Sequence, residues 1–571
     1  MKVVVESSRI IKPAHNADHI CPPLTITQHI ALSVFDKVTF DTHIAVIYAF
    51  RPPTPPNSMI EEGLAKVLAE YREYAGRFGE DSEGNRVILL NDEGVRFVEA
   101  SVDTILSNAM PFKPSPSLLD FHPSADGVEE LLLVQLTRFT CGSLVLGFSS
   151  HHIIADGHAT SNFLVSWGLA SRGLSISPLP LHDRTSLFVP RQPPQLEFEH
   201  RGVEFKSKKS RDSNMENPLK NEVVIHKAHF TKEFLSKLKA TASVGRDQPY
   251  TTFQCLVAHL WRIVTKARGL NGCETTHVRI AVDGRRRMIP AVPDGYSGNL
   301  VLWAFPRANV RELMKRPLQY AADLIRTEVA KVEDSYFKSF IDFSSSGAAE
   351  EEGLMPTADA DEMVLCPNLE VDSWTRFPFY DLDFGGGSPY YFVPSYLPVE
   401  GLLILLPSFI GDGSIDAFVP LFHHNLDSFK LCNLVLWAFP RANVRELMKR
   451  PLQYAADLIR TEVAKVEDSY FKSFIDFSSS GAAEEEGLMP TADADEMVLC
   501  PNLEVDSWTR FPFYDLDFGG GSPYYFVPSY LPVEGLLILL PSFIGDGSID
   551  AFVPLFHHNL DSFKLCCYSM D

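Results

Sequence analysis

Residues 151–157 read His-His-Ile-Ile-Ala-Asp-Gly, and their types and spacing suit catalysis. An apolar run precedes them and a helical pattern follows, so the histidines are expected at a turn between a strand and a helix. An imidazole there suits general-base chemistry, because its pKa lies near neutral pH. We predict that His152 removes a proton from a group that attacks a carbonyl carbon, and that Asp156 and Gly157 hold the turn.

The His-x-x-x-Asp spacing alone is weak evidence, because it occurs by chance and most single histidines are structural. Residues 423–427 repeat the spacing, but Ser428 follows them in place of glycine and no strand-to-helix turn is expected. A metal site at His151, His152 and His158 is a second interpretation. No cysteine or glutamate at suitable spacing completes such a set, so we expect no metal.

An exact internal repeat is the oddest feature of the chain: residues 299–432 recur without a change as residues 433–566. Structural repeats have units of about 20 to 50 residues, so a recent duplication or a gene-model error explains the copy better than a functional repeat. We expect the first copy to complete the fold, because its closing loop is shorter. The second copy would remain a partial domain that aggregates or swaps, and an inactive product is the non-enzyme hypothesis.

The composition bounds the class of protein. A chain of 571 residues is long enough for two or three domains, and no apolar run approaches the roughly 20 residues of a membrane span. The nine cysteines form no Cys-x-x-Cys pair, which indicates reduced thiols in the cytoplasm. The net charge of −22, half of it from the second copy, argues against nucleic-acid partners and weakly favours small cationic molecules.

The N-terminal half is expected to mix strands and helices. A strand at His43–Phe50 ends at a proline-rich stretch, because proline donates no ladder hydrogen bond. A helix follows to about Gly76, with capping-box spacing between Ser58 and Glu61. The further elements expected are a hairpin of residues 86–91 and 94–100, strands 130–139 and 144–150, and helix 159–170.

A proline-rich and then charged stretch, residues 178–222, predicts an exposed crossover to a second domain that begins near Val223. This domain is expected to contain helix 230–243, helix 253–268 capped by Thr251 and Thr252, and strands 278–282 and 299–305. The expected organisation is a mixed α/β protein with an N-terminal domain 1–200, a linker 201–222, a C-terminal domain 223–432, the duplicate 433–566 and a tail 567–571.

Two motifs together resemble those of the plant BAHD acyltransferases. The first is the His152–Gly157 segment, and the second is the family's Asp-Phe-Gly-Trp-Gly, found here as Asp383-Phe384-Gly385-Gly386-Gly387. Their order and separation fit the family, as does the 437-residue length without the second copy. Glycine in place of tryptophan at position 386 is similar to the hydroxycinnamoyl-CoA amine transferases of this family.

The resemblance implies two chloramphenicol-acetyltransferase-like domains with a channel between them, through which CoA and the acceptor reach His152 from opposite faces. It implies direct transfer of a coumaroyl or feruloyl group from acyl-CoA, a co-substrate, to a small amine. Agmatine is the first expectation; putrescine, tryptamine, tyramine or, in an ester-forming enzyme, an alcohol are the alternatives. We expect a cytoplasmic monomer of phenolamide biosynthesis and plant defence, without a permanently bound cofactor.

Further site residues are expected from the same comparison and from charge. The resemblance places Asp383 in the active site or in the support of its own loop, with Phe384, Gly385 and Gly387 as structural residues. The candidates for CoA binding are Arg285 and Arg287, whose guanidinium groups suit phosphate, and Thr251 and Thr252 at a helix N-terminus. A solvated basic turn is the alternative for the arginines. Glu370 and Asp372 are the candidates for binding the second cation of the acceptor.

Overall fold

The computed structural model describes residues 2–14, 28–110, 112, 114–207, 223–270, 272–358, 363–430, 438–479, 498–499, 502–509, 513–515, 523, 526–528, 533–542 and 548–566. The chain forms two compact units, Met1–Cys432 and Asn433–Asp571, and each is described by itself. Most of the predicted linker, the second Asp-Phe-Gly-Gly-Gly segment and the tail lie outside the described residues.

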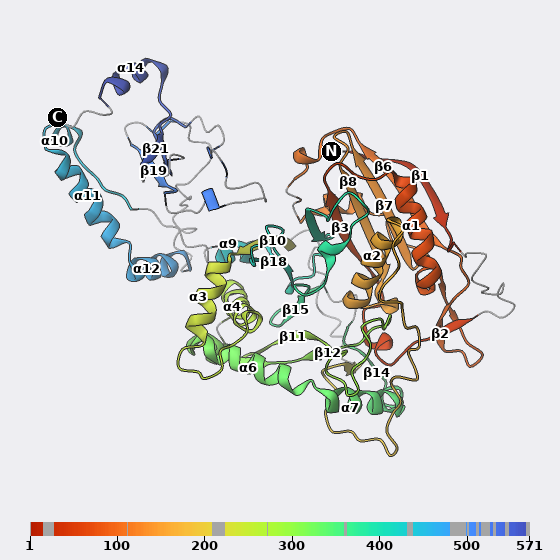
Figure 1. Ribbon diagram of the computed structural model, residues 1–571. Helices are drawn as coiled ribbons and strands as arrows, with labels where there is room; N and C mark the ends of the chain where they lie inside the picture. The colour runs from red at the N-terminus through yellow and green to blue at the C-terminus, as the bar shows by residue number, and fades with distance from the viewer. Residues whose placement is uncertain are drawn as a thin grey trace. The chain divides into compact units, whose positions relative to one another are not determined.

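A six-stranded sheet forms the first layer of unit 1 (Figure 1). Its strands, in spatial order, are β1 (Val3–Ile11), β6 (Val95–Val102), β7 (Leu132–Phe139), β8 (Leu144–His151), β3 (His43–Phe50) and β16 (Tyr391–Pro394). Helices α1 (Asn57–Glu70) and α2 (Gly157–Ser171) pack against each other and supply apolar side chains to the same core. Because β16 comes from late in the chain, the first sheet is complete only when the later half has folded.

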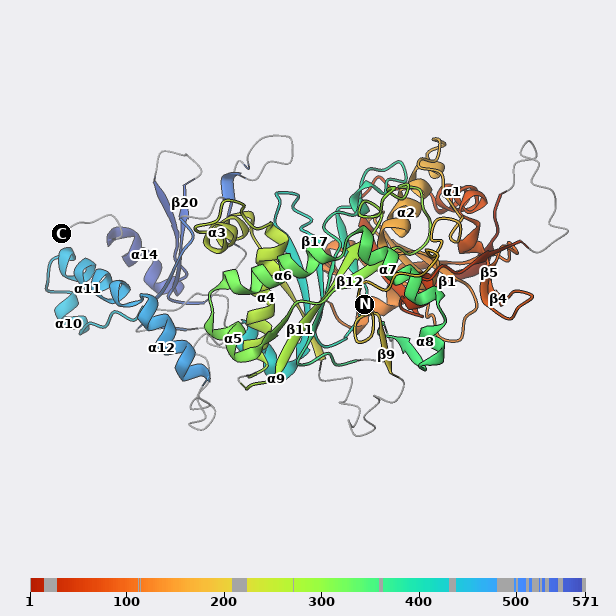
Figure 2. The ribbon, with the colours of Figure 1, turned by 90° about the horizontal axis from the view of Figure 1, so that it is seen from below.

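A second sheet lies in the later half of unit 1. Its strands are β10 (Val223–Phe230), β18 (Ile415–Phe422), β17 (Leu402–Pro407), β15 (Leu369–Ser373), β11 (Thr275–Asp283) and β12 (Val301–Ala304), with β13 (Arg307–Asn309) also on β11. Helices α3 (Lys232–Ala242), α4 (Thr252–Ala267), α6 (Leu318–Lys331) and α9 (His423–Lys430) pack on one another and on this sheet (Figure 2).

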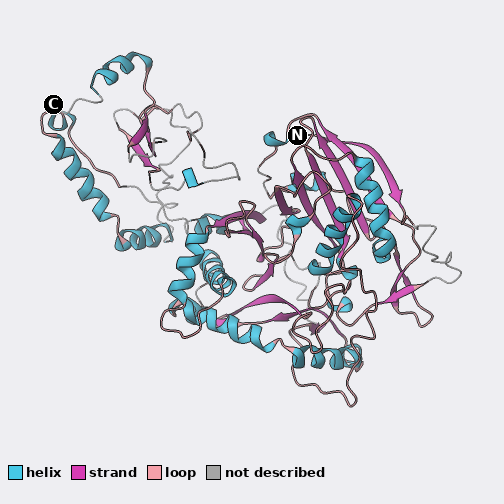
Figure 3. Cartoon of the chain, viewed as in Figure 1, coloured by secondary structure: helices cyan, strands magenta, loops and turns pink. Residues whose placement is uncertain are grey.

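The two faces of this second sheet belong to different cores. Leu369 and Val371 of β15 join the core beneath the helices, whereas Ile404 and Leu406 of β17 join the core of the first sheet. The alternation follows from the two-residue period of a strand. Both halves of the unit therefore mix helices with strands, as predicted (Figure 3).

Smaller elements complete unit 1. They are β2 (His29–Ala31), β4 (Arg77–Glu80), β5 (Arg86–Leu89), β9 (Phe205–Ser207), β14 (Leu354–Pro356), α5 (Val310–Lys315), α7 (Asp334–Ser345) and α8 (Ala348–Glu351), with short 3-10 turns such as η1 (Asp36–Val38) and η5 (His152–Ile154). Within the described ranges, none of the helices combines the length and apolar composition that crossing a membrane requires.

Two local predictions were wrong. The predicted hairpin does not form, because β5 pairs with β4 and β2 while β6 pairs with β1 and β7. The turn chemistry is real, since Asp92 and Gly94 have φ angles of 52° and 94°, but it sends the chain from one sheet to another. Pro56, not Ser58, stands at the N-cap of α1, and Glu61 instead pairs with Arg9 of β1.

Unit 2 repeats part of unit 1. Its helices α10 (Val444–Leu447), α11 (Leu452–Lys465), α12 (Asp468–Ser479) and α14 (His557–Cys566) and strands β19 (Glu504–Ser507), β20 (Leu536–Pro541) and β21 (Ile549–Phe552) correspond to elements of the first copy. The strands pair β19-β20-β21, as β15, β17 and β18 do in unit 1. The first copy therefore completes the second sheet of unit 1, as expected from its shorter connection.

Candidate active site

The predicted strand-to-helix turn is present at residues 151–157. Strand β8 ends at His151, the η5 turn follows, and the Asp156 carboxylate caps α2 by accepting a hydrogen bond of 2.9 Å from the Ala159 amide. Gly157 is needed for close packing, because a Cβ atom there would lie 2.6 Å from the Phe377 ring. The backbone at the turn is thus fixed on both sides of His152.

The two adjacent histidines lie in different surroundings. The His151 ring packs edge-on against the rings of His43 and Phe78, with centroid distances of 5.0 and 4.8 Å. Burial, together with the neighbouring positive charges, lowers the pKa of His151 to about 3. His151 is therefore a neutral core residue, and His152 is the histidine left for chemistry.

His152 is held from the side of its Nδ1 atom. Thr39 Oγ1, just after η1, lies 2.9 Å from Nδ1, and the Phe40 ring lies edge-on with a centroid distance of 6.0 Å. Burial lowers the pKa of His152, against the opposing effect of the Asp156 carboxylate. In the tautomer whose Nδ1–H donates to Thr39 Oγ1, the Nε2 lone pair of the neutral imidazole is available as a base.

Buried polar groups support the backbone of the turn. Asn299 Nδ2 donates to the carbonyl oxygens of His152 and Ile153 at 3.0 and 2.9 Å, and also to Asp36 Oδ1. Asp36 pairs with Arg184 at 3.1 Å, and both side chains are fully buried. Sequence reasoning assigned no site role to these residues, because Asp36, Arg184 and Asn299 lie far apart along the chain.

Asp156 is also half of a buried ion pair that joins the turn to the second sheet. Arg285, just after β11, donates to both carboxylate oxygens at 2.7 and 3.0 Å, and the Leu300 amide donates at 2.9 Å. Burial would raise the pKa of Asp156, but the Arg285 charge and hydrogen bonds hold it below its ordinary value. The predicted role of Asp156 in holding the turn fits this geometry.

The prediction that Arg285 contacts CoA is wrong for this structure, because its side chain is only 1% exposed and its donors go to Asp156 and to carbonyl oxygens. Arg287 is half-buried and donates from Nη1 to the carbonyl oxygens of Val329 and Val332 near the end of α6. Thr251 caps α4 in a capping box with Gln254. The capping prediction is thus confirmed; the cap engages the Gln254 amide, and the CoA contact of Thr251 and Thr252 stays a prediction.

The Asp383 loop lies at the other end of α2. A Cβ atom on Gly168 would lie 2.7 Å from the Asp383 carbonyl oxygen, and Arg172 pairs with the Asp383 carboxylate at 3.2 Å. Gly168 follows Asp156 by twelve residues, and a helix rises about 1.5 Å per residue, so the loop lies roughly 18 Å from the turn. This geometry favours the alternative role, in which Asp383 supports its own loop.

Asp383 instead holds its own loop. Its Oδ1 atom accepts hydrogen bonds from the amides of Gly385 and Gly387 at 2.7 and 2.9 Å, and both glycines have positive φ angles, 104° and 99°. Phe384 is buried against the Trp167 ring of α2, with a centroid distance of 5.0 Å. These are the structural roles predicted for Phe384, Gly385 and Gly387.

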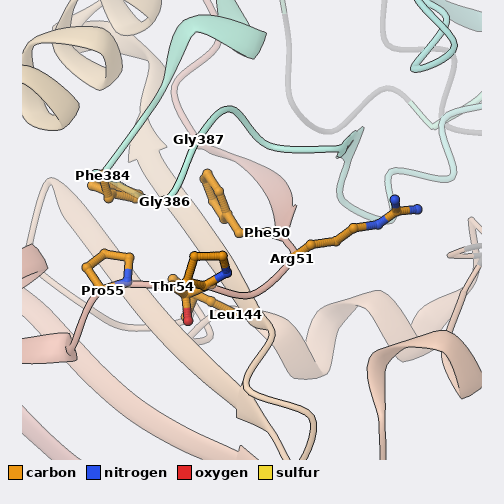
Figure 4. Close-up of a pocket in the computed structure, with 9 residues that line it drawn as sticks. Phe50, Arg51, Thr54, Pro55, Leu144, Phe384, Gly386 and Gly387 are labelled. Atoms are coloured by element: carbon orange, nitrogen blue, oxygen red, sulfur yellow. The ribbon is translucent and has the colours of Figure 1, made fainter. Parts of the chain in front are cut away.

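Gly386 approaches the proline-rich turn after β3. A Cβ atom on Gly386 would lie 2.2 Å from the Pro53 carbonyl oxygen, so no larger residue fits this backbone arrangement. A small hollow beside it is lined by Phe50, Arg51, Pro53, Thr54, Pro55, Leu144, Phe384, Gly386 and Gly387 (Figure 4). The hollow belongs to the Asp383 loop and not to the surroundings of His152.

Glu370 and Asp372 lie on the face of β15 opposite its core residues. Arg279 of β11 lies 3.5 Å from the Glu370 carboxylate. The same guanidinium stacks on Trp303 at 4.0 Å and reaches the Phe40 ring at 5.8 Å. Phe40 also lies beside His152, with a centroid distance of 6.0 Å, and the acceptor-binding role of Glu370 and Asp372 stays a prediction.

The Asp372 carboxyl has a pKa near neutral pH. Burial, reinforced by the negative charge of Glu370, raises the pKa of Asp372 to about 7, against the opposing charge of Arg279. A cation that binds beside this carboxyl would lower its pKa, because the cation stabilises the ionised form.

Comparison with known proteins gives three findings. The Transferase family matches residues 1–432 and again residues 430–570. Agmatine hydroxycinnamoyltransferase 1 of Oryza sativa subsp. japonica is 58% identical over 447 residues, covering 76% of this chain and 99% of its own. Agmatine coumaroyltransferase-1 of Hordeum vulgare is 57% identical over 435 residues, covering 76% and 99%.

Solved structures share the fold. Vinorine synthase matches with a TM-score of 0.58 at 24% identity, over 75% of this chain and 96% of its own. TRI101 of F. sporotrichioides, complexed with coenzyme A and T-2, matches with a TM-score of 0.59 at 20% identity, over 71% and 97%. The shares covered correspond to one copy of the repeat and not two.

Proposed function

This chain belongs to the BAHD acyltransferases of the Transferase family, and from this premise we propose that it transfers a hydroxycinnamoyl group from CoA to an amine, agmatine first and putrescine second. The observation that carries the proposal is the neutral His152 imidazole, held through Nδ1 at the strand-to-helix turn, with the Phe40 ring beside it. The named activities of the relatives supply the acyl and acceptor classes.

His152 is the general base. When its Nδ1–H donates to Thr39 Oγ1, the Nε2 lone pair can take a proton from the acceptor nitrogen as that nitrogen bonds to the thioester carbon. The tetrahedral intermediate then collapses with cleavage of the carbon–sulfur bond, and the imidazolium returns the proton to the sulfur. No acyl-enzyme forms, and His152 ends neutral, as it began.

Glu370 and Asp372 bind the far end of the acceptor. Agmatine carries a guanidinium beyond its amine, and a buried cation needs a carboxylate partner. Asp372, with a pKa of about 7, supplies negative charge when this cation arrives. Glu370 already pairs with Arg279, and the guanidinium of Arg279 reaches the Phe40 ring that lies beside His152.

Unit 1 is then divided into an N-terminal domain 1–200, whose sheet is completed by β16 of the later half, and a C-terminal domain 223–432, joined by 201–222 and with a channel between the two domains. CoA enters on one side and the amine on the other. Arg287 and the first turn of α4 at Thr251 and Thr252 remain the CoA candidates, whereas Arg285 serves the fold. Acyl-CoA is a co-substrate.

The test follows release of the CoA thiol from coumaroyl-CoA with agmatine, putrescine, tryptamine or an alcohol as the acceptor. Four proteins are compared: the full chain, the chain lacking residues 433–566, and each of these with His152→Ala. Activity that needs both agmatine and His152 supports the proposal. Activity only with an alcohol acceptor would replace the amine assignment. Activity only in the shortened chain would mean that the second copy inactivates the enzyme, and silence in all of them would contradict the proposal.

A further inference from the structure

Arg279 of β11 is a buried arginine whose hydrogen-bonding capacity the fold uses only in part. Its Nη1 atom donates to the Thr357 carbonyl oxygen at 3.2 Å and lies 3.5 Å from the Glu370 carboxylate. Within the described residues, its Nε and Nη2 atoms are buried without a hydrogen-bond partner. Buried donors that stay unengaged are uncommon in folded proteins and call for an explanation.

A second buried arginine in the same half shows what a structural pair looks like. Arg268, just after α4, donates from Nε and Nη2 to the two carboxylate oxygens of Glu400 at 2.8 Å each. Its Nη1 atom donates to the Asn368 carbonyl oxygen at 2.9 Å, so all three nitrogens are engaged. Arg279 makes no bidentate pair of this kind, and its place on β11 is better explained by its charge than by its hydrogen bonds.

The charged groups around Arg279 lie on one face of the second sheet. Arg279 and Glu370 are register partners in the parallel pair of β11 and β15, and Asp372 follows two residues later on the same face of β15. The charges that act on the Asp372 carboxyl are those of Glu370 and Arg279. These three residues, the Arg279 cluster, hold one positive and two negative charges, which leaves a net charge of −1 when Asp372 is ionised.

The reacting form of the proposed acceptor carries a matching charge. The amine that attacks the thioester must first lose its proton, because an ammonium nitrogen has no lone pair. Agmatine then keeps only its guanidinium, and putrescine keeps only its second ammonium. Each presents one positive charge to the site, and any charge left without a partner in a buried site costs free energy.

We propose, on the basis of the proposed function, that Arg279 sets the number of positive charges that the acceptor carries beyond its reacting amine. Arg279 compensates Glu370, so the cluster accepts a single further cation. The guanidinium is held by stacking on Trp303 at 4.0 Å, and it lies 5.8 Å from the ring of Phe40. Without Arg279, the two carboxylates would fit an acceptor with two further cations, such as the linear triamine spermidine.

Competition between agmatine and spermidine for coumaroyl-CoA tests the proposal in the full chain. The ratio of the two kcat/KM values is measured at about pH 8, above the pKa of Asp372. Arg279→Met removes the charge and keeps an unbranched side chain, whereas the matched control Arg279→Lys keeps the charge. Arg279→Met is expected to move the ratio towards spermidine by about tenfold or more, and Arg279→Lys should leave it unchanged.

A second pair of variants decides the question even if Arg279→Met does not fold. Glu370→Gln leaves the cluster without net charge, so kcat/KM for agmatine should fall by about tenfold. The double variant Arg279→Met/Glu370→Gln restores the net charge of −1 and leaves Glu370 no buried charge to pair. Removing the arginine from Glu370→Gln should therefore raise kcat/KM for agmatine again, which loss of a merely structural residue would not do.

Two results would overturn the proposal: a folded Arg279→Met chain with an unchanged ratio, or a double variant no more active with agmatine than Glu370→Gln. In either case, activity of the unaltered chain with agmatine would leave the proposed function standing. An unaltered chain that is inactive with both amines would instead contradict the proposed function, and this inference with it.

Discussion

Thr39 Oγ1 lies 2.9 Å from His152 Nδ1, and no carboxylate is recorded at that distance from the ring within the described residues. The hydroxyl therefore orients the imidazole without the charge that a carboxylate would add. Replacing it by Thr39→Val leaves Nδ1 without its partner and releases the ring. We expect kcat to fall by about 10- to 100-fold with little change in the KM for either substrate.

The conservative variant Thr39→Ser keeps the hydroxyl and is expected to retain most of the activity. Steady-state kinetics over a range of pH separate the two. If Thr39 only filled space, the Thr39→Val variant would retain more activity than the Thr39→Ser variant.

The raised pKa of Asp372 predicts a pH dependence of acceptor binding. Below about pH 7 the carboxyl is protonated, and above it the carboxyl is ionised and available to a cation. The KM for agmatine should therefore fall as the pH rises through 7. Because the amine itself also titrates, the variant Asp372→Asn is measured alongside, and the ratio of the two KM values is the informative quantity. A constant ratio would contradict a role for Asp372 in binding the acceptor.

The raised pKa of Asp372 also predicts that the free energy of unfolding falls as the pH rises. A carboxyl whose folded pKa is raised holds its proton in the folded state when the unfolded state has lost it, so stability falls as the pH rises. For Asp372 this loss spans the interval from its ordinary pKa of 3.8 to about 7. Denaturant unfolding at several pH values should show a shallower decline for Asp372→Asn than for the unaltered chain.

Arg285 and Asp156 form a buried pair between the catalytic turn and the second sheet. Removing the arginine by Arg285→Ala leaves a buried carboxylate without its partner, which costs about 3 to 5 kcal/mol of unfolding free energy. Denaturant melts would measure the loss. A matched change at the exposed neighbour, Arg286→Ala, should cost almost nothing. A CoA contact would instead raise the KM for acyl-CoA while leaving stability intact.

Asp383 should behave as a structural residue. Asp383→Ala removes the acceptor for two glycine amides and the partner of Arg172, so the free energy of unfolding should fall by about 1 to 3 kcal/mol. Activity per folded molecule should remain, whereas His152→Ala abolishes it. Kinetics at a temperature where both variants are folded make the comparison. Loss of kcat in folded Asp383→Ala would place this residue in catalysis after all.

Much of the architecture was predictable because periodicity reports local structure. The strand His43–Phe50, the turn at His152 and the Thr251 cap all depend on neighbouring residues and were found. The errors arose where distant segments meet. Nothing near Arg285 in the sequence shows that its partner is Asp156. Likewise, Asp383 was a catalytic candidate only because its motif resembles one of the family's motifs. A shared motif does not show how far Asp383 lies from His152.

The repeat provides its own control for the last prediction. Val371 and Val505 are identical positions, buried at 1% exposure and exposed at 52%. Val371→Asp places an unpaired carboxylate in the core and should cost more than about 4 kcal/mol, enough to abolish folding of unit 1. Val505→Asp makes the same chemical change in unit 2 and should leave both the thermal unfolding of unit 1 and the transfer of the acyl group unchanged. Activity assays and thermal melts on the two full-length variants decide the matter: if Val505→Asp inactivated the enzyme while Val371→Asp did not, the second copy would be the one that completes the fold.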